Sequence, residues 1–247
     1  MKKILLILLA IGVLAGGYYL VRIMPILTTD NAGADRVVLL HGLGRSEMSM
    51  LLIQSALTEA GFDVFNIGYP STDLLPGELL ATVSAEIDDC CANRPETVHF
   101  VGHSLGGLLI RDYLGASLPS NLGRVVLLGT PNKGSELANA ELPDALQSSL
   151  LEMAGPTARA LGTGPDDYPA SLPAPNYSIG VIAGTRDTTL ANKWLPLPND
   201  GLVSVDSASI DGMTDFIEFD VNHWELRTDP AVARQVSEFL LNGTFAH

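Results

Sequence analysis

Short apolar runs alternate along this chain with longer segments in which apolar residues recur at helical spacing. Apolar runs of this kind are typical of strands buried on both faces of a sheet. Alternation with helices favours crossover connections, which join parallel strands. The sequence therefore predicts an α/β fold with a mostly parallel central sheet and helices on both of its faces. The expected strands lie near residues 36–40, 62–67, 97–101, 124–129, 177–183 and 215–220, and the expected helices near 48–60, 76–92, 104–115 and 229–241.

The third expected strand leads into Gly102-His103-Ser104-Leu105-Gly106, which an apolar helix follows. A Gly-x-Ser-x-Gly segment between a strand and a helix is typical of a nucleophile elbow, the sharp turn that exposes a catalytic serine. We expect that side chains at Gly102 and Gly106 would collide with the neighbouring strand and helix. The alternative is that Ser104 only caps the helix that follows it.

A second glycine-rich loop follows the first expected strand, in the order His41-Gly42-Leu43-Gly44. Acyl transfer needs two positioned donors for the oxyanion, and backbone amides are the usual source. One donor is expected from Leu105, directly after Ser104. The other is expected from Leu43, because the glycines on either side leave the backbone open to a substrate. His41 is expected to shape this loop and not to act as a base.

Four segments together resemble the α/β-hydrolases, and more narrowly the bacterial lipases and lipase-like esterases. The resemblance spans roughly residues 35 to 240. It implies an α/β-hydrolase fold, an acyl-enzyme mechanism and a triad in the order Ser, Asp or Glu, and then His. The last segment is similar to the part of those lipases that carries the acid, which assigns the acid to Asp200. The segments are His41–Gly44, Gly102–Gly107, Gly129–Ser135 and Asn199–Ser204.

The general base and the acid follow from that order. Of the five histidines, only His223 and His247 come after both the elbow and a candidate acid, and His247 is the last residue of the sequence. We therefore predict His223 as the base that takes the proton of Ser104 and returns it to the leaving group. Asp187 remains an alternative to Asp200, because it ends an apolar strand where many α/β-hydrolases keep their acid. Alternatively, Asp187 forms a simple ion pair with its neighbour Arg186 in this loop.

Residues 132–176 interrupt the alternation of strands and helices, since they are rich in Pro, Gly, Ser and Ala. In an α/β-hydrolase this position holds the cap or lid over the active site, and the alternative is an ordinary surface excursion. A helical piece is expected near 142–151. Its apolar residues recur at roughly helical spacing. They are Leu142, Leu146, Leu150, Leu151 and Met153.

The first 29 residues predict a signal anchor or a signal peptide. Lys2 and Lys3 precede an uncharged apolar run over residues 4–21, which is long enough to span a bilayer. Basic residues before such a run keep the N-terminus in the cytoplasm. Residues 30–247 are then expected to form a hydrolase domain outside the cytoplasm. That domain is anchored to the inner membrane and faces the periplasm or extracytoplasmic space, or it is secreted if the leader is cleaved.

The chain is acidic, with a formal net charge of −14, and all 28 of its acidic residues lie beyond the apolar run. Such a surface argues against a nucleic-acid partner and against electrostatic docking on anionic lipid. Cys90 and Cys91 are adjacent. We expect two thiols here, because a disulfide between neighbours closes a strained ring and constrains little of the unfolded chain. No cluster of ligand residues indicates a metal, and no cofactor is expected.

These features predict a serine hydrolase that cleaves carboxylic esters of lipids or small molecules through Ser104, Asp200 and His223. The same triad would serve a thioesterase, an amidase or an acyltransferase. The rival from another class is a catalytically dead, membrane-tethered binding protein. That rival would be expected to have lost Ser104, His223 or the glycines around them, and all are present. The sequence indicates neither the acyl chain length nor the oligomeric state.

Overall fold

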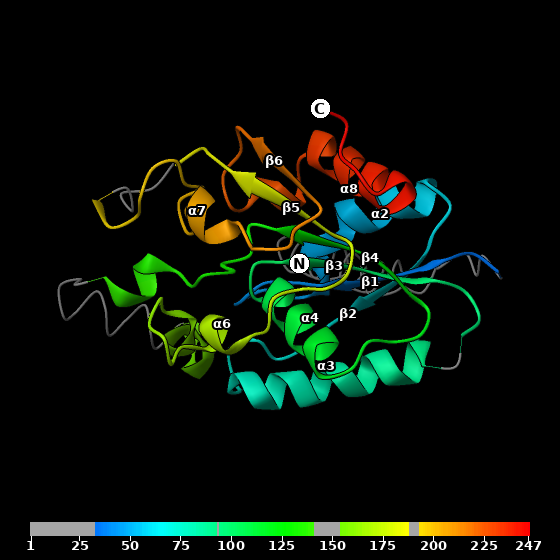
Figure 1. The fold of residues 1–247 in the computed structure, drawn as a ribbon, viewed down its shortest axis with the longest axis horizontal. Helices are drawn as coiled ribbons and strands as arrows, with labels where there is room; N and C mark the ends of the chain where they lie inside the picture. Colours follow the sequence, from blue (N-terminus) through cyan, green and yellow to red (C-terminus); the bar gives the residue numbers. More distant parts are fainter. Residues whose placement is uncertain (1–32, 93, 141–153, 188–192) are drawn as a thin grey trace, which may run out of the picture. The chain divides into compact units, whose positions relative to one another are not determined.

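Six parallel strands form one sheet in the order β2-β1-β3-β4-β5-β6 (Figure 1). The computed structural model describes residues 33–92, 94–140, 154–187 and 193–247, and residues 33–247 form one unit. All six strands lie where the apolar runs predict them. They are β1 (Arg36–Leu40), β2 (Asp63–Ile67), β3 (Val98–His103), β4 (Leu122–Leu128), β5 (Ile179–Gly184) and β6 (Asp215–Phe219).

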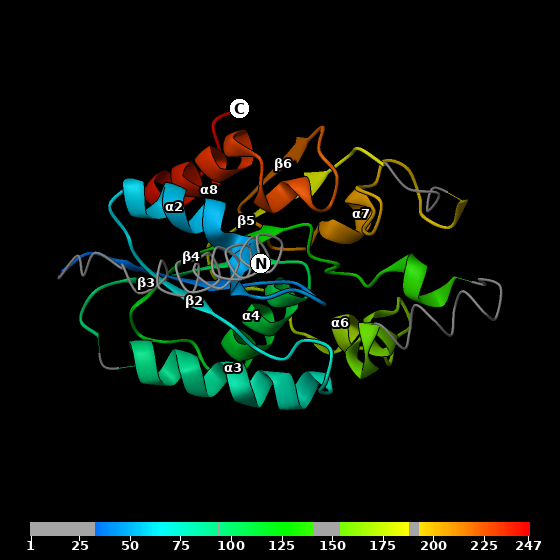
Figure 2. The same ribbon diagram turned by 180° about the vertical axis from the view of Figure 1, so that it is seen from behind.

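Four long helices cover the sheet, two on each face (Figures 1 and 2). One face carries α2 (Leu51–Glu59) and α8 (Pro230–Asn242), and the other carries α3 (Pro76–Cys91) and α4 (Leu105–Ala116). These helices confirm the α/β architecture that the sequence predicts. The shorter helical turns are η2 (Glu47–Met50), η3 (Glu136–Asn139), η4 (Pro156–Leu161), α6 (Tyr168–Ser171), α7 (Val205–Ala208) and η6 (Glu225–Arg227).

Two apolar layers explain why the strands read as nearly continuous apolar runs. Along β1, Val38 and Leu40 pack toward α3 and α4, whereas Val37 and Leu39 pack toward α2 and α8. Neighbouring side chains of a strand point to opposite faces, and here both faces are covered by helices. All four of these side chains are fully buried.

The strand order reverses direction between β1 and β3. The chain passes from β1 outward to β2, returns to β3 on the other side of β1, and then continues to β6. The loops that leave β1 and β3 therefore run in opposite directions. In open parallel sheets, ligands bind outside the carboxyl ends of the strands at such a reversal. Gly42 follows β1 and Ser104 follows β3, so both candidate loops lie at this point.

The expectation of two free thiols is wrong. Cys90 and Cys91 form a disulfide at the C-terminal end of α3. Cys91 is buried in the apolar layer under α3, and Cys90 packs partly against the same layer. The backbone carbonyl of Cys90 accepts a hydrogen bond from Arg36 at 2.9 Å, which ties this end of α3 to β1. Adjacency in the sequence argued against the bond, but the fold holds both sulfur atoms at one helix end.

Two predicted segments lie outside the described residues. The apolar N-terminal run lies outside them, and so does the helix expected near 142–151. The described part of 132–176 contains the short turns η3, η4 and α6. None of the helices in the described ranges has the length and apolar character needed to cross a membrane.

Gly106 is expected to tolerate no side chain. A β-carbon there would overlap the carbonyl oxygen of Leu40 and lie 2.5 Å from that of His41. Because both atoms belong to the backbone after β1, α4 would have to shift away from the sheet. We expect Gly106→Ala to lower the free energy of unfolding by at least about 2 kcal/mol, as measured by urea denaturation.

Gly77 provides the matched control for this prediction. It lies in α3, and a β-carbon there would meet no atom within 4 Å. Gly77→Ala is expected to raise the free energy of unfolding by about 0.5 kcal/mol, because alanine restricts the unfolded chain more than glycine does. Equal stability of the two variants would contradict the close contact at Gly106.

Candidate active site

Ser104 occupies a strained turn between β3 and α4. Its φ and ψ angles are 55° and −123°, and within the described residues no other non-glycine residue has a positive φ. A β-carbon at Gly102 would lie 2.5 Å from the Cα atom of Gly107, so the turn requires glycine where the sequence predicts it. Strained backbone of this kind is typical of functional sites, where it fixes the direction of a side chain. The Ser104 side chain is partly exposed at the start of α4.

Asp200 lies in the tight loop that follows β5, between Asn199 and Ser204, which form an isolated antiparallel bridge. Its side chain is 2% exposed. Oδ1 accepts hydrogen bonds from the backbone amides of Leu202 at 2.9 Å and Val203 at 2.8 Å. A buried carboxylate with two such donors is held in one orientation, so its second oxygen is free to receive another donor.

That second oxygen meets His223. Asp200 Oδ2 lies 2.7 Å from His223 Nδ1, and the His223 backbone amide donates to the Asp200 carbonyl at 2.9 Å. Of the two carboxylates that the sequence left open, Asp200 thus lies against the histidine and Asp187 does not make this bond. Because an ionised carboxylate only accepts, Nδ1 carries the proton and Nε2 is left with a lone pair. This is the tautomer that a general base requires.

The end of β4 brings Ser104 and the Asp200–His223 pair together. The Ser104 amide donates to the carbonyl of Leu128 at 2.9 Å. At the next residue, Gly129, a β-carbon would lie 3.0 Å from Asp200 Oδ2 and 3.1 Å from His223 Nδ1. Within the described residues the Ser104 hydroxyl makes no hydrogen bond, to His223 or to any other group. Such bonds are often long in sites without substrate and tighten when substrate binds.

The loop after β1 lies directly against Ser104. A β-carbon at Gly42 would lie 3.0 Å from the β-carbon of Ser104. Leu43 follows, and its side chain packs partly against the apolar layer beneath α3 and α4. In the described part of the chain, the backbone amides of Leu43 and Leu105 donate to no protein acceptor. The two amides that the sequence predicts as oxyanion donors therefore flank Ser104 and are available to a ligand.

A sequence profile of the alpha/beta hydrolase family matches residues 37–241. The chain belongs to the alpha/beta hydrolase family. The matched region runs from β1 to α8, so it contains the elbow, the acid loop and His223. This result confirms the family that the four sequence segments indicate.

Two curated relatives of this hydrolase are triacylglycerol lipases. The protein from Pseudarthrobacter phenanthrenivorans is 36% identical over an alignment of 124 residues. That alignment covers 44% of this chain and 38% of that protein. The one from Burkholderia plantarii is also 36% identical over 124 residues, which are 44% of this chain and 34% of that protein. The match thus spans little more than a third of the length of these relatives. The mature lipase BlEst2 of Bacillus licheniformis shares the fold, with a TM-score of 0.63 and 21% identity over 87% of this chain and 94% of that chain.

His41 shapes the loop after β1 in this hydrolase, as the sequence predicts. Its ring stacks on Tyr69 with 4.1 Å between centroids. The Tyr69 amide donates to Nε2 at 3.3 Å, so Nδ1 carries the proton that bonds the Gly42 carbonyl at 2.9 Å. The Tyr69 hydroxyl donates to the His41 carbonyl. Both ring nitrogens are thus hydrogen-bonded to the backbone, one to Gly42 and one to Tyr69, which leaves neither free to act as a base.

His103 has a role that the sequence did not reveal. Its ring lies 4.7 Å from the ring of His223, and its Nε2 lies 2.9 Å from the His223 backbone carbonyl. A carbonyl only accepts, so His103 Nε2 donates this bond. Burial, followed by the nearby His223, lowers the pKa of His103 well below its ordinary value. The residue before Ser104 therefore ties the loop of His223 to the turn between β3 and α4. The only sequence signal was its position beside Ser104.

Folding stability is expected to fall when the pH drops below about 6.5. Burial lowers the folded-state pKa of His41, His99 and His103 from 6.5. Below that pH the unfolded chain binds protons that the folded chain refuses, so each histidine removes at most about 1.4 kcal/mol per pH unit until its folded pKa is passed. Above pH 6.5 these histidines are neutral in both the folded and the unfolded chain, so the free energy of unfolding is not reduced by them. Urea denaturation at pH 7.5, 6.5 and 5.5 measures this slope.

His99 offers a control for this pH dependence, because it lies in β3 away from the turn at Ser104. His99→Gln is expected to reduce the slope between pH 6.5 and 5.5, by at most one proton, because glutamine does not titrate. The lowered pKa of Asp215 does not interfere, since it acts only near and below its ordinary value of 3.8. Stability that stays constant from pH 7.5 to 5.5 would contradict the assignment of neutral buried histidines.

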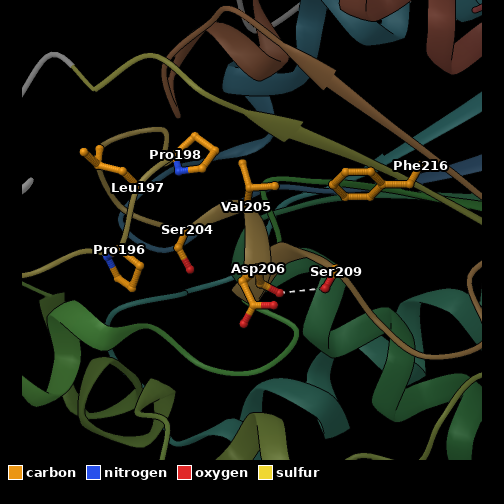
Figure 3. A pocket seen from close by; sticks show the side chains of 8 residues that line it. All are labelled: Pro196, Leu197, Pro198, Ser204, Val205, Asp206, Ser209 and Phe216. Atoms are coloured by element: carbon orange, nitrogen blue, oxygen red, sulfur yellow. Dashed lines mark hydrogen bonds between the residues drawn. The ribbon is translucent and has the colours of Figure 1, made fainter.

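A hollow of about 320 Å³ lies beside α7, and neither Ser104 nor His223 lines it (Figure 3). Two of its hydroxyls are already bonded, since Ser204 donates to Glu136 at 2.8 Å and Ser209 donates to the Asp206 carbonyl at 2.7 Å. In the described ranges, no three His, Cys, Asp or Glu side chains gather in a way that would hold a metal ion. The residues that line the hollow are Pro196, Leu197, Pro198, Ser204, Val205, Asp206, Ser209 and Phe216.

Proposed function

We propose that this protein is a serine hydrolase that cleaves carboxylic esters through an acyl-enzyme. The observation that carries the proposal is the buried 2.7 Å hydrogen bond between Asp200 and His223, held next to the strained turn of Ser104. The three residues come from separate loops at the carboxyl edge of the sheet. A nucleophile, a base and a group that orients the base are the parts that acyl transfer requires.

In the proposed reaction, His223 Nε2 takes the proton of the Ser104 hydroxyl as its oxygen attacks the ester carbonyl. The carbonyl electrons move onto oxygen, and the backbone amides of Leu43 and Leu105 stabilise this oxyanion. The tetrahedral intermediate collapses, and protonated His223 gives its proton to the departing alcohol. Water then attacks the acyl-enzyme with the same base, which releases the acid and restores Ser104. Asp200 keeps Nδ1 protonated and stabilises the imidazolium in both halves of the cycle.

The triacylglycerol lipases that this chain resembles support an ester as the substrate, rather than a thioester or an amide. Their names favour acyl esters of lipids, and small esters use the same machinery. Esterases, thioesterases, amidases and acyltransferases that use such a triad differ only in the leaving group and in the acceptor. The ester assignment therefore rests on the relatives, and the acyl-enzyme step rests on the geometry.

We also propose that the hydrolase domain acts outside the cytoplasm, either anchored by the apolar N-terminal run or secreted. The disulfide between Cys90 and Cys91 supports this proposal. Disulfides persist in oxidising compartments and are rare in the reducing cytoplasm. The run of uncharged apolar residues after Lys2 and Lys3 supports the same location.

A labelling experiment tests the proposed function. The full chain is treated with a fluorophosphonate, digested, and examined by mass spectrometry while hydrolysis of p-nitrophenyl acetate, butyrate and palmitate is followed. We expect one adduct, on the peptide that contains Ser104, and loss of ester hydrolysis in step with labelling. Ester hydrolysis that persists after complete labelling of Ser104 would refute the mechanism. Activity on an acyl thioester but on no oxygen ester would show that the protein is a thioesterase.

A further inference from the structure

Two arginines and one tryptophan meet beside the candidate catalytic residues. The guanidinium carbon of Arg45 lies 4.1 Å from the centre of the Trp224 ring, and that of Arg227 lies 6.0 Å from it. Trp224 directly follows His223 and is 42% exposed. Arg45 directly follows the loop that presents Leu43. Two cations and an exposed aromatic ring therefore stand at the edge of the site, held by cation–π contacts.

Among the described residues, neither arginine is paired with an acid, although the chain has twice as many acidic as basic residues. The described part of the chain holds ion pairs for Arg36, Arg94, Lys133 and Arg186, but none for Arg45 or Arg227. Arg227 donates from Nη1 to the Ser49 carbonyl at 3.2 Å, while its buried Nε has no partner. A partly buried cation without a carboxylate partner is costly, so an external anion beside Trp224 would stabilise the charge of Arg227.

The position of these side chains relative to His223 identifies the part of the substrate that they would contact. His223 protonates the oxygen of the departing alcohol, so the alcohol portion must lie beside His223 and the residues that follow it. Both arginines also lower the pKa of His103, the ring next to His223, which places their charge within electrostatic reach of the centre. The acyl portion, by contrast, belongs on the far side of the oxyanion amides.

We infer that Arg45, Arg227 and Trp224 bind an anionic group, a carboxylate or a phosphate, on the alcohol portion of the ester substrate. This inference rests on the proposed serine hydrolase function. The Arg45 guanidinium lies over the Trp224 ring, and within the described residues its N–H edge makes no hydrogen bond. That edge matches the paired oxygens of a carboxylate or phosphate. A dissolved small ester and a lipid with an anionic headgroup both supply this chemistry.

The test compares two esters that differ mainly in charge, 4-acetoxybenzoate and the neutral 4-acetoxybenzamide. The measured quantity is the ratio of kcat/KM for the anionic ester to kcat/KM for the neutral ester, at low salt. Intrinsic differences in reactivity cancel when this ratio is compared between the wild type and variants. We expect Arg45→Gln to lower the ratio about threefold to fivefold, in line with a partly exposed charge pair. The Arg45→Gln, Arg227→Gln double variant should lower it about tenfold.

Arg234→Gln is the matched control. Arg234 is exposed on α8, has no ion pair among the described residues and makes no cation–π contact with Trp224, so this change removes one charge outside the arginine pair. It should leave the ratio at the wild-type value. Salt at 0.5 M should lower the wild-type ratio toward that of Arg45→Gln, because ions screen an exposed pair. Since Arg45 is exposed, its replacement reports on the site even if a change at the half-buried Arg227 impairs folding.

A second arm separates the two sources of the anion. It compares a short-chain phosphatidate with the matching neutral diacylglycerol in the same detergent micelles. A fall in the ratio confined to this arm assigns the anion to a lipid phosphate, and a fall with the benzoate pair assigns it to a dissolved ester. An unchanged ratio in both arms for Arg45→Gln and the double variant would overturn the inference while leaving ester hydrolysis intact. Absence of Ser104-dependent turnover of every ester would instead overturn the proposed function, and the inference with it.

Discussion

Ser104→Ala is expected to lower kcat/KM for p-nitrophenyl esters by about 10⁴- to 10⁶-fold, since without the hydroxyl no acyl-enzyme forms. The residual rate would come from the amides of Leu43 and Leu105, which still stabilise an oxyanion when water attacks directly. The alanine keeps the β-carbon of serine, so the turn between β3 and α4 is retained. Steady-state hydrolysis at saturating and at low substrate concentration measures the loss.

Two further serine variants separate chemistry from folding. Ser55 lies on α2, where its hydroxyl bonds only the exposed Glu59 at 3.3 Å, so Ser55→Ala should keep wild-type kcat/KM. Ser104→Gly should be as inactive as Ser104→Ala, yet more stable than the wild type by about 1 kcal/mol. Glycine adopts a φ of 55° without the strain that a side chain imposes. Wild-type hydrolysis by Ser104→Ala would show that another residue is the nucleophile.

Asp200→Asn is expected to lower kcat by about 10⁴-fold with little change in the fold. Asparagine keeps an oxygen that can accept from the amides of Leu202 and Val203, so the loop retains its shape. Its amide group can donate to His223 Nδ1, which moves the ring proton to Nε2 and removes the lone pair that Ser104 needs. The expected signature is therefore a large loss in kcat with unchanged urea denaturation.

Asp187→Asn is the matched comparison for the acid. Asp187 was the second carboxylate that the sequence allowed, and it lies just beyond the end of β5. Since His223 Nδ1 is bonded to Asp200, we expect Asp187→Asn to retain kcat within a few-fold of the wild type. A loss of about 10⁴-fold in Asp187→Asn, with near-normal turnover in Asp200→Asn, would reverse the assignment of the acid.

The two cations beside Trp224 would give this hydrolase a preference that its overall charge opposes. A formal net charge of −14 repels anionic substrates at long range. Arg45 and Arg227 act only at short range, where direct contact and N–H geometry decide recognition, although salt still weakens the exposed contact of Arg45. The strongly acidic chain and an anionic substrate are therefore compatible if recognition depends on contact and not on steering.

The sequence alone determined the features that depend on neighbours along the chain. Buried parallel strands require continuous apolar runs and half-buried ones an alternation of apolar and polar residues, so the central strands and the edge strand β6 were both predictable from short windows. The elbow was predictable for a steric reason, because Gly102 and Gly106 stand where a β-carbon meets backbone. His223 followed from order along the chain, since the one other histidine after the elbow and an acid, His247, is the last residue.

Only the tertiary structure decided the features that depend on distance across the fold. It placed Asp200, and not Asp187, against His223, because the Asn199–Ser204 loop turns its carboxylate toward the end of β4. It joined Cys90 to Cys91, although adjacency argued against the bond. It also set the ring of His103 against His223, and Arg45 against Trp224, pairs that lie more than a hundred residues apart. Periodicity and local sterics carry no information on such contacts, which exist only once β1, β3 and the last loops share one edge of the sheet.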